Sequence, residues 1–216
     1  THDTAGTGVA SMMACYEAGA DAVDCCNDAM SGLTSQPSMG ALIQNYADTE
    51  HDTGIQLPNL LKLTPYWEAT RRQYAPFESG QKSAGADVYV NEIPGGQYTN
   101  MLFQATSLGL ATEWDNVKSS YAAANRVLGN IVKVTPSSKV VGDLAQFMVT
   151  NKLDEHSVVE RSSELNFPSS VVDFLQGGLG IPIGGFPEPF RSRVLKELPR
   201  IEGRPGASME SLDLSK

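Results

Sequence analysis

The chain contains 216 residues, 41% of them hydrophobic and 19% charged, which is enough apolar material for one large folded domain or two small ones. Its 25 acidic residues outnumber its 16 basic ones and leave a net charge of −9, so binding to nucleic-acid phosphates is not expected. No apolar run reaches the roughly 18 residues that a membrane-spanning helix requires, and we therefore expect no spanning segment.

The first hundred residues alternate between helical and strand-like patterns. Apolar residues recur at helical spacing over 9–18, 40–47 and 58–74. Pro65 should kink or split the last of these helices. Short apolar runs at 20–26 and 87–90 predict buried parallel strands, and a helix followed by a glycine and a strand indicates an alternating α/β arrangement.

After residue 97 the strand signals nearly vanish. Helical spacing continues through 98–110, 113–128, 137–151, 157–165, 169–176 and 189–198. The change near residue 100 predicts a domain boundary, with an α/β part at 1–100, a helical part at 101–208 and the start of a linker at 209–216. Since the sequence begins at Thr1 without Met or a signal-peptide pattern, we expect a piece of a longer polypeptide.

The cysteines give no sign of a disulfide framework. Cys15, Cys25 and Cys26 are odd in number and two of them are adjacent. No Cys-x-x-Cys pair predicts a metal site either. We expect buried free thiols and a reducing compartment.

His2 is the first residue whose position points to chemistry. A histidine at the end of a predicted strand, followed by small residues at 4–8, is typical of the ligand-binding mouth of a (β/α)₈ barrel, where a neutral imidazole binds divalent metals. The alternative is a surface histidine. A single histidine cannot form a metal site, and the surroundings of His51 and His156 are those of surface residues.

A second cluster lies at 135–139. The hydroxyls of Thr135 and Ser138 begin a predicted helix whose N–H groups would be unpaired, and Lys139 adds a cation. Such groups suit proton exchange with a carboxylate or a polarised carbonyl. The alternative is that both hydroxyls only cap their own helix. A third site, Gln97, follows paired glycines that would place it at the barrel mouth, or in a turn without further role.

These motifs together resemble the carboxyltransferase domain of the pyruvate carboxylase family. The resemblance is carried by 2–6, 31–38, 91–100, 134–139, 142–148 and 184–208. The run Asn-Glu-Ile-Pro-Gly-Gly-Gln-Tyr-Thr-Asn at 91–100 separates the sequence from lyases and Claisen-type synthases of the same barrel. Oxaloacetate decarboxylase and transcarboxylase subunits are closer, and a non-catalytic helical docking module is a third alternative.

The resemblance implies a partial (β/α)₈ TIM barrel, with C-terminal strands only, followed by an all-helical funnel domain. It also implies transfer of CO₂ from carboxybiotin to pyruvate to give oxaloacetate, with Thr135 moving a proton between pyruvate and biotin. Ser138 and Lys139 match positions beside the biotin ring, and Gln97 is expected to bind substrate. His2 matches one ligand of a divalent metal, Zn or Mn.

Much of the family's machinery has no counterpart in this sequence. The other metal ligands and the substrate-binding arginine would precede Thr1, and the biotin carrier and the ATP-using domain are absent. We therefore expect the isolated chain to be inactive, although its parent is a biotin-dependent carboxylase. The resemblance further implies a homo-oligomeric parent, a tetramer, in the mitochondrial matrix, with the cytoplasm as the alternative.

Overall fold

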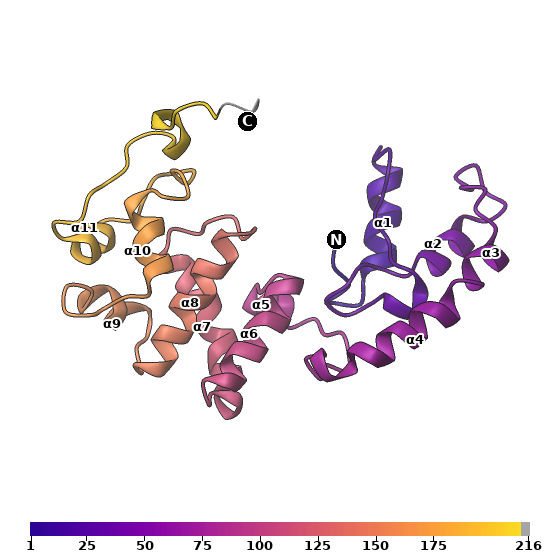
Figure 1. Ribbon diagram of the computed structural model, residues 1–216, viewed down its shortest axis with the longest axis horizontal. Coiled ribbons are helices and arrows are strands. Elements are labelled where there is room, and N and C mark those ends of the chain that lie inside the picture. Colours follow the sequence, from indigo (N-terminus) through magenta and orange to yellow (C-terminus); the bar gives the residue numbers. More distant parts are fainter. Residues whose placement is uncertain (213–216) are drawn as a thin grey trace. The chain divides into compact units, whose positions relative to one another are not determined.

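The computed structural model describes residues 1–212, and helices dominate them (Figure 1). Contacts divide the chain into two units, Thr1–Gln104 (unit 1) and Ala105–Lys216 (unit 2), and helix α6 contains the boundary. The predicted division near residue 100 into a barrel part and a helical extension stays a prediction. Of the predicted linker at 209–216, residues 213–216 lie outside the described part.

Most helices of unit 1 match the helical spacing of the sequence, and the helix at 88–91 does not. The helices are α1 (Gly8–Glu17), α2 (Met39–Tyr46), α3 (Leu57–Leu61), α4 (Thr64–Tyr74), α5 (Val88–Asn91) and the first part of α6 (Gly95–Ser107), with single 3₁₀ turns η1 (Asp28–Met30) and η2 (Ala75–Phe77). The predicted helix at 58–74 splits just before Pro65, which occupies the first turn of α4, where a missing backbone N–H costs nothing.

The predicted partial TIM barrel is wrong, because residues 1–212 contain no strand. The segment 20–26 is extended, but its only bridge joins Cys26 to Ser38 in parallel. Two backbone hydrogen bonds make that bridge, from Cys26 N–H to the Pro37 carbonyl and from Met39 N–H to the Cys26 carbonyl, both 2.9 Å. A strand requires a continuous ladder, and no neighbouring strand in the described part supplies one.

The second predicted strand, at 87–90, is the short helix α5. Its backbone groups bond locally: the N–H of Asn91 donates to the Asp87 carbonyl, and the N–H of Glu92 donates to that of Val88. Glu92 then ends the helix in the left-handed region, at φ 61°. The β propensity of Val88 and Val90 is a weak preference, which local helical bonding overrides here.

Unit 1 has a small core. Met12, Leu42 and Tyr46 are buried where α1 packs on α2. His51, predicted to be a surface residue, is half-buried, with its ring 5.0 Å from that of Tyr16 and 5.6 Å from that of Tyr46. The predicted surface position of His156 is confirmed, since its side chain is 79% exposed.

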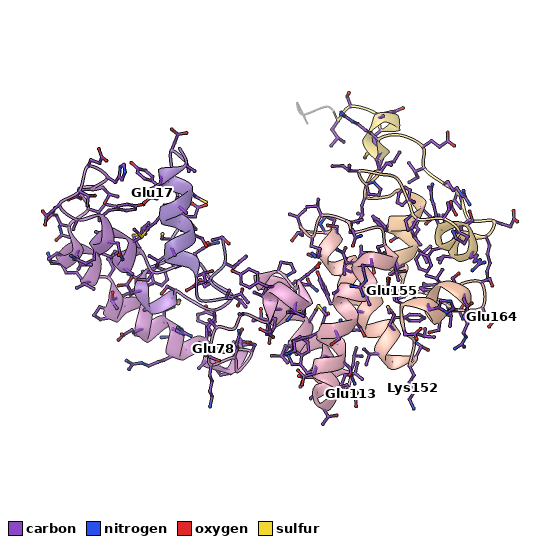
Figure 2. All side chains as sticks on the ribbon, turned by 180° about the vertical axis from the view of Figure 1, so that it is seen from behind. Glu17, Glu78, Glu113, Lys152, Glu155 and Glu164 are labelled. Atoms are coloured by element: carbon purple, nitrogen blue, oxygen red, sulfur yellow. The ribbon has the colours of Figure 1, made fainter. Side chains whose placement is uncertain are left out.

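Helix α4 contributes no buried residue to unit 1. It is tied to η1 by Arg71, which donates to the Ala29 carbonyl at 3.0 Å and pairs with Glu78 at 2.8 Å. Figure 2 labels Glu78, which directly follows η2. The attachment of α4 therefore depends on polar contacts more than on apolar burial.

Unit 2 is helical, as its sequence predicts. Its helices are α7 (Trp114–Val127), α8 (Ser137–Thr150), α9 (Glu155–Glu160), α10 (Ser169–Gln176) and α11 (Phe190–Leu195), with 3₁₀ turns η3 (Ala111–Glu113) and η4 (Pro205–Ser208). Helix α8 packs against both α7 and α10 (Figure 1). Tyr121 of α7 and Val141 and Leu144 of α8 are fully buried. None of the helices in residues 1–212 is long and apolar enough to span a bilayer.

Candidate functional site

The loop before α8 is held by a serine that the sequence did not single out. The Ser137 hydroxyl lies 2.6 Å from the carbonyl oxygens of both Val132 and Val134 and accepts a hydrogen bond from the Val134 N–H at 3.2 Å. One side chain thus folds the loop back on the helix start. The signal available in the sequence was a third hydroxyl between Thr135 and Ser138.

Thr135 lies at the exposed turn of this loop. Among the described residues its hydroxyl takes part in no hydrogen bond, so the alternative that it caps its own helix is wrong. The expected unpaired N–H groups are wrong for two residues of the first turn. The N–H of Ser138 donates to the Val134 carbonyl and that of Lys139 to the Pro136 carbonyl, both at 3.1 Å. The Thr135 hydroxyl and the Lys139 ammonium are exposed donors beside this turn.

Ser138 and Lys139 point to different surroundings although they are adjacent. Ser138 is buried, with 7% of its surface exposed, and its carbonyl accepts a hydrogen bond from the Tyr121 hydroxyl at 3.4 Å. The Lys139 side chain is 59% exposed, and its ammonium pairs with Asp143 one turn along α8. Lys139 therefore presents its charge to solvent beside Thr135, whereas Ser138 has little surface left for a ligand.

His2 lies against the first residue of α6. A Cβ added to Gly95 would come within 2.5 Å of the His2 Cγ, so only glycine admits the imidazole at this distance. Gln97 is half-buried in the same helical turn. The glycines at 95 and 96 begin a helix, and the expected turn after a strand is wrong. His2 and the turn that carries Gln97 thus come together in unit 1, while Thr135, Ser138 and Lys139 belong to unit 2.

The side chains of residues 1–212 do not complete a metal site. No group of three or more His, Cys, Asp or Glu gathers closely enough there to hold an ion. His2 supplies one ligand at most, fewer than any stable divalent site requires. Asp3, its neighbour in sequence, accepts a hydrogen bond from the Gly8 N–H at 2.7 Å and so holds the start of α1.

The three cysteines differ in burial, and one of them has a perturbed thiol. All three are free, but Cys15 is exposed and Cys25 and Cys26 are half-buried, so the predicted burial is wrong for Cys15 and overstated for the other two. Partial burial, together with Cys26 and Asp24, raises the pKa of the Cys25 thiol. A raised pKa lowers the thiolate fraction at neutral pH and with it the reactivity.

A hollow of about 600 Å³ lies in unit 1 between the loop at 31–35 and α4. Trp67, Tyr74 and Phe77 supply its apolar wall, and Arg71, already paired with Glu78, lies among them. Neither His2 nor Gln97 lines it. The predicted site residues therefore do not converge on this cavity.

Comparison with known proteins places the chain in a family. The family described as a conserved carboxylase domain matches residues 88–216. The mitochondrial pyruvate carboxylase of Homo sapiens is 57% identical over 99% of the chain, and the pyruvate carboxylase of Aspergillus niger is 55% identical over 100% of it. The chain spans 18% of the length of these curated relatives.

Solved structures of pyruvate carboxylase also match the chain. The carboxyl transferase domain of Rhizobium etli pyruvate carboxylase matches with a TM-score of 0.95 at 47% identity, over 100% of this chain and 36% of that one. The same domain solved with pyruvate and biocytin also matches with a TM-score of 0.95.

Proposed function

The chain belongs to the conserved carboxylase domain family, and from that premise we propose that it forms part of a carboxyltransferase domain that moves a carboxyl group from carboxybiotin to pyruvate, giving oxaloacetate. The observation that carries this proposal is the unbroken likeness of the whole chain, in sequence and in fold, to such domains. The R. etli domain solved with pyruvate and biocytin supplies the substrate class.

Thr135 is the residue to which we assign proton transfer. A hydroxyl both donates and accepts a hydrogen bond, so it can pass a proton between two partners without carrying a charge. Its exposed position and its freedom from hydrogen bonds within the described residues support this role, since a hydroxyl already bonded would have to break that contact first.

Lys139 is assigned to binding the biotin side of the reaction. Its exposed ammonium would attract negative charge on the ureido oxygen, and it lies at the start of the helix that Thr135 precedes. Ser138 stays in the proposal as a hydroxyl near the same ring, reached only through its small exposed surface. When bound, biotin supplies the carboxyl group; the residues of this chain orient it.

His2 and Gln97 are assigned to the pyruvate side of the reaction. We propose His2 as one ligand of a divalent metal, Zn or Mn, and Gln97 as a substrate-binding amide. Because the described residues do not complete a metal site, no step of the reaction is assigned to the metal here.

The same proposal covers the parent polypeptide. Its biotin would be attached to a carrier domain and its ATP used in another domain, with the subunits forming a tetramer in the mitochondrial matrix. The human relative is named as a mitochondrial protein, which supports the location. We expect the isolated chain, given carboxybiotin and pyruvate, to form no oxaloacetate, because one metal ligand cannot hold the ion. Detectable oxaloacetate would contradict this.

The decisive experiment is Thr135→Ala in the complete parent. Loss of a positioned proton shuttle should lower carboxyl transfer by about 10²- to 10⁴-fold. Biotin-dependent ATP cleavage should continue, because that step belongs to another domain. Thr150→Ala, an exposed threonine at the other end of α8, is the matched control and should change neither rate. Unchanged transfer in Thr135→Ala would favour the docking alternative.

A further inference from the structure

Asp143 connects two helices at the place where Lys139 is exposed. Its Oδ2 atom is 2.5 Å from the Lys139 Nζ, one turn back along α8, and 2.5 Å from the Ser170 Oγ in the first turn of α10. The Asp143 side chain is 18% exposed, against 59% for Lys139. One carboxylate oxygen thus accepts from two donors on two packed helices.

This arrangement restricts Lys139 more than it stabilises the fold. An ion pair between helix neighbours with one exposed partner contributes little to stability. A lysine side chain, however, is long and flexible, and without a partner its ammonium samples many positions. Ser170 fixes the carboxylate from α10, so the carboxylate in turn fixes the ammonium. Two of the three ammonium protons remain available for a ligand.

We infer that Asp143, anchored by Ser170, positions the Lys139 ammonium for the ureido oxygen of biotin. The inference rests on the function proposed above for Lys139. Asp143 is a positioning residue, since it acts through Lys139, and α10 takes part in the site by holding it. Neither Asp143 nor Ser170 was singled out from the sequence as a site residue, although the spacing of Lys139 and Asp143 is that of a helical ion pair.

The test uses the complete parent and free biocytin. In the assay, oxaloacetate passes its carboxyl group to biocytin and leaves pyruvate, which is measured. Asp143→Asn keeps the shape of the side chain and removes its charge. We expect the KM for biocytin to rise about tenfold, because a misplaced binding group loses part of its contact, while the KM for oxaloacetate stays the same. Ser170→Ala should raise the biocytin KM about two- to threefold, as the carboxylate keeps Lys139 but loses its anchor.

Three further variants test the charge of Asp143, the specificity of the effect and the role of Lys139. Asp143→Glu keeps the charge and should recover part of the biocytin affinity. Glu160→Gln removes the exposed contact of the Glu160 carboxylate with the His156 ring on α9 and should leave the biocytin KM unchanged. Lys139→Met tests the underlying function: if it leaves the biocytin KM unchanged, the proposed role of Lys139 fails, and the inference fails with it.

The inference alone is overturned by either of two results. One is a raised biocytin KM in Lys139→Met together with an unchanged KM in Asp143→Asn. The other is an Asp143→Asn variant that lowers the thermal midpoint and all partial reactions equally, because that pattern marks a structural role. A change in the biocytin KM alone supports the proposed positioning role of Asp143. If Asp143→Asn fails to fold, the biocytin KM of Ser170→Ala tests the same role.

Discussion

Unit 1 and unit 2 are of similar length but bury their side chains differently. In unit 2, α8 packs between α7 and α10, and side chains such as Val141 and Leu144 are completely buried. In unit 1, the core at α1 and α2 is small, and α4 buries no residue although it carries Tyr66, Trp67 and Tyr74. Unit 2 has the helical pattern that its sequence predicts, whereas unit 1 is helical where strands were also predicted.

The comparison teaches that an apolar pattern predicts a helix but not its partner. Most of the stability of a helix in a protein comes from packing of its apolar face. Where a second amphipathic helix is available, as for α7 and α8, that face is buried. On α4 the apolar side chains stay exposed, with Tyr66 at 66% and Tyr74 at 61%. Unit 2 should therefore be the more resistant to opening.

The largest expected effect is the loss of a core side chain in unit 2. Leu144→Ala leaves a cavity among fully buried neighbours and should lower the free energy of unfolding by about 2–5 kcal/mol. Leu63→Ala, at a residue 54% exposed beside α4, should change it by less than about 0.5 kcal/mol. Amide hydrogen exchange of the chain, read separately for each unit, measures both. Equal effects would break the comparison and indicate that the α4 face is covered.

The helical pattern of unit 2 proved a better guide to structure than the mixed pattern of unit 1. Helices such as α8 and α10 were predicted closely, because their apolar spacing agrees with their packing. The strands at 20–26 and 87–90 were wrong, since strand formation depends on partners that no local pattern reveals.

The surroundings of the proposed site residues could be predicted in part. Sequence motifs located Thr135 and Lys139, and the structure leaves both exposed. They could not show that Ser138 is buried or that Ser137 holds the loop, because helix phase and loop hydrogen bonds decide which of three neighbouring hydroxyls faces inward. Contacts between distant residues, such as Asp143 with Ser170, also lie beyond a local pattern.

A smaller effect tests the close approach within unit 1. Gly95→Ala places a Cβ against His2 and should destabilise unit 1 by about 1–3 kcal/mol through overpacking. Gly96→Ala is the matched control: a Cβ there meets nothing within 4 Å, so the substitution should be neutral or stabilising by up to about 1 kcal/mol. Hydrogen exchange of the α6 amides distinguishes the two variants. Equal exchange rates in both would mean that His2 moves aside without cost.

At the start of α9, a substitution of Asp154 should change local stability in a pH-dependent way, and only in unit 2. Hydrogen bonds from the side chain and then the backbone N–H of Ser157 hold the pKa of Asp154 below its ordinary value. A carboxylate with a lowered folded pKa stabilises the protein above its unfolded pKa, and this contribution disappears as pH falls through the folded pKa. The α9 amides should therefore exchange faster in Asp154→Asn than in the original chain at pH 7. In acid the stabilities of α9 in the two proteins should become equal. A difference that persists unchanged in acid would contradict the assignment.

The smallest effect is expected from the ion pair that ties α4 in unit 1. Arg71 and Glu78 are 44% and 48% exposed, so solvent screens their attraction, and Glu78→Gln should cost about 0.2–1 kcal/mol. Arg71→Met should cost somewhat more, because it also removes the hydrogen bond to the Ala29 carbonyl that joins α4 to η1. Added salt should reduce the cost of Glu78→Gln but leave the Ala29 contribution largely intact. Chemical denaturation at low and high salt measures how the cost of each substitution depends on salt. If Glu78→Gln proves as costly as a core truncation, polar contacts are the main stabilising force of unit 1. The contrast with unit 2 is then sharper still.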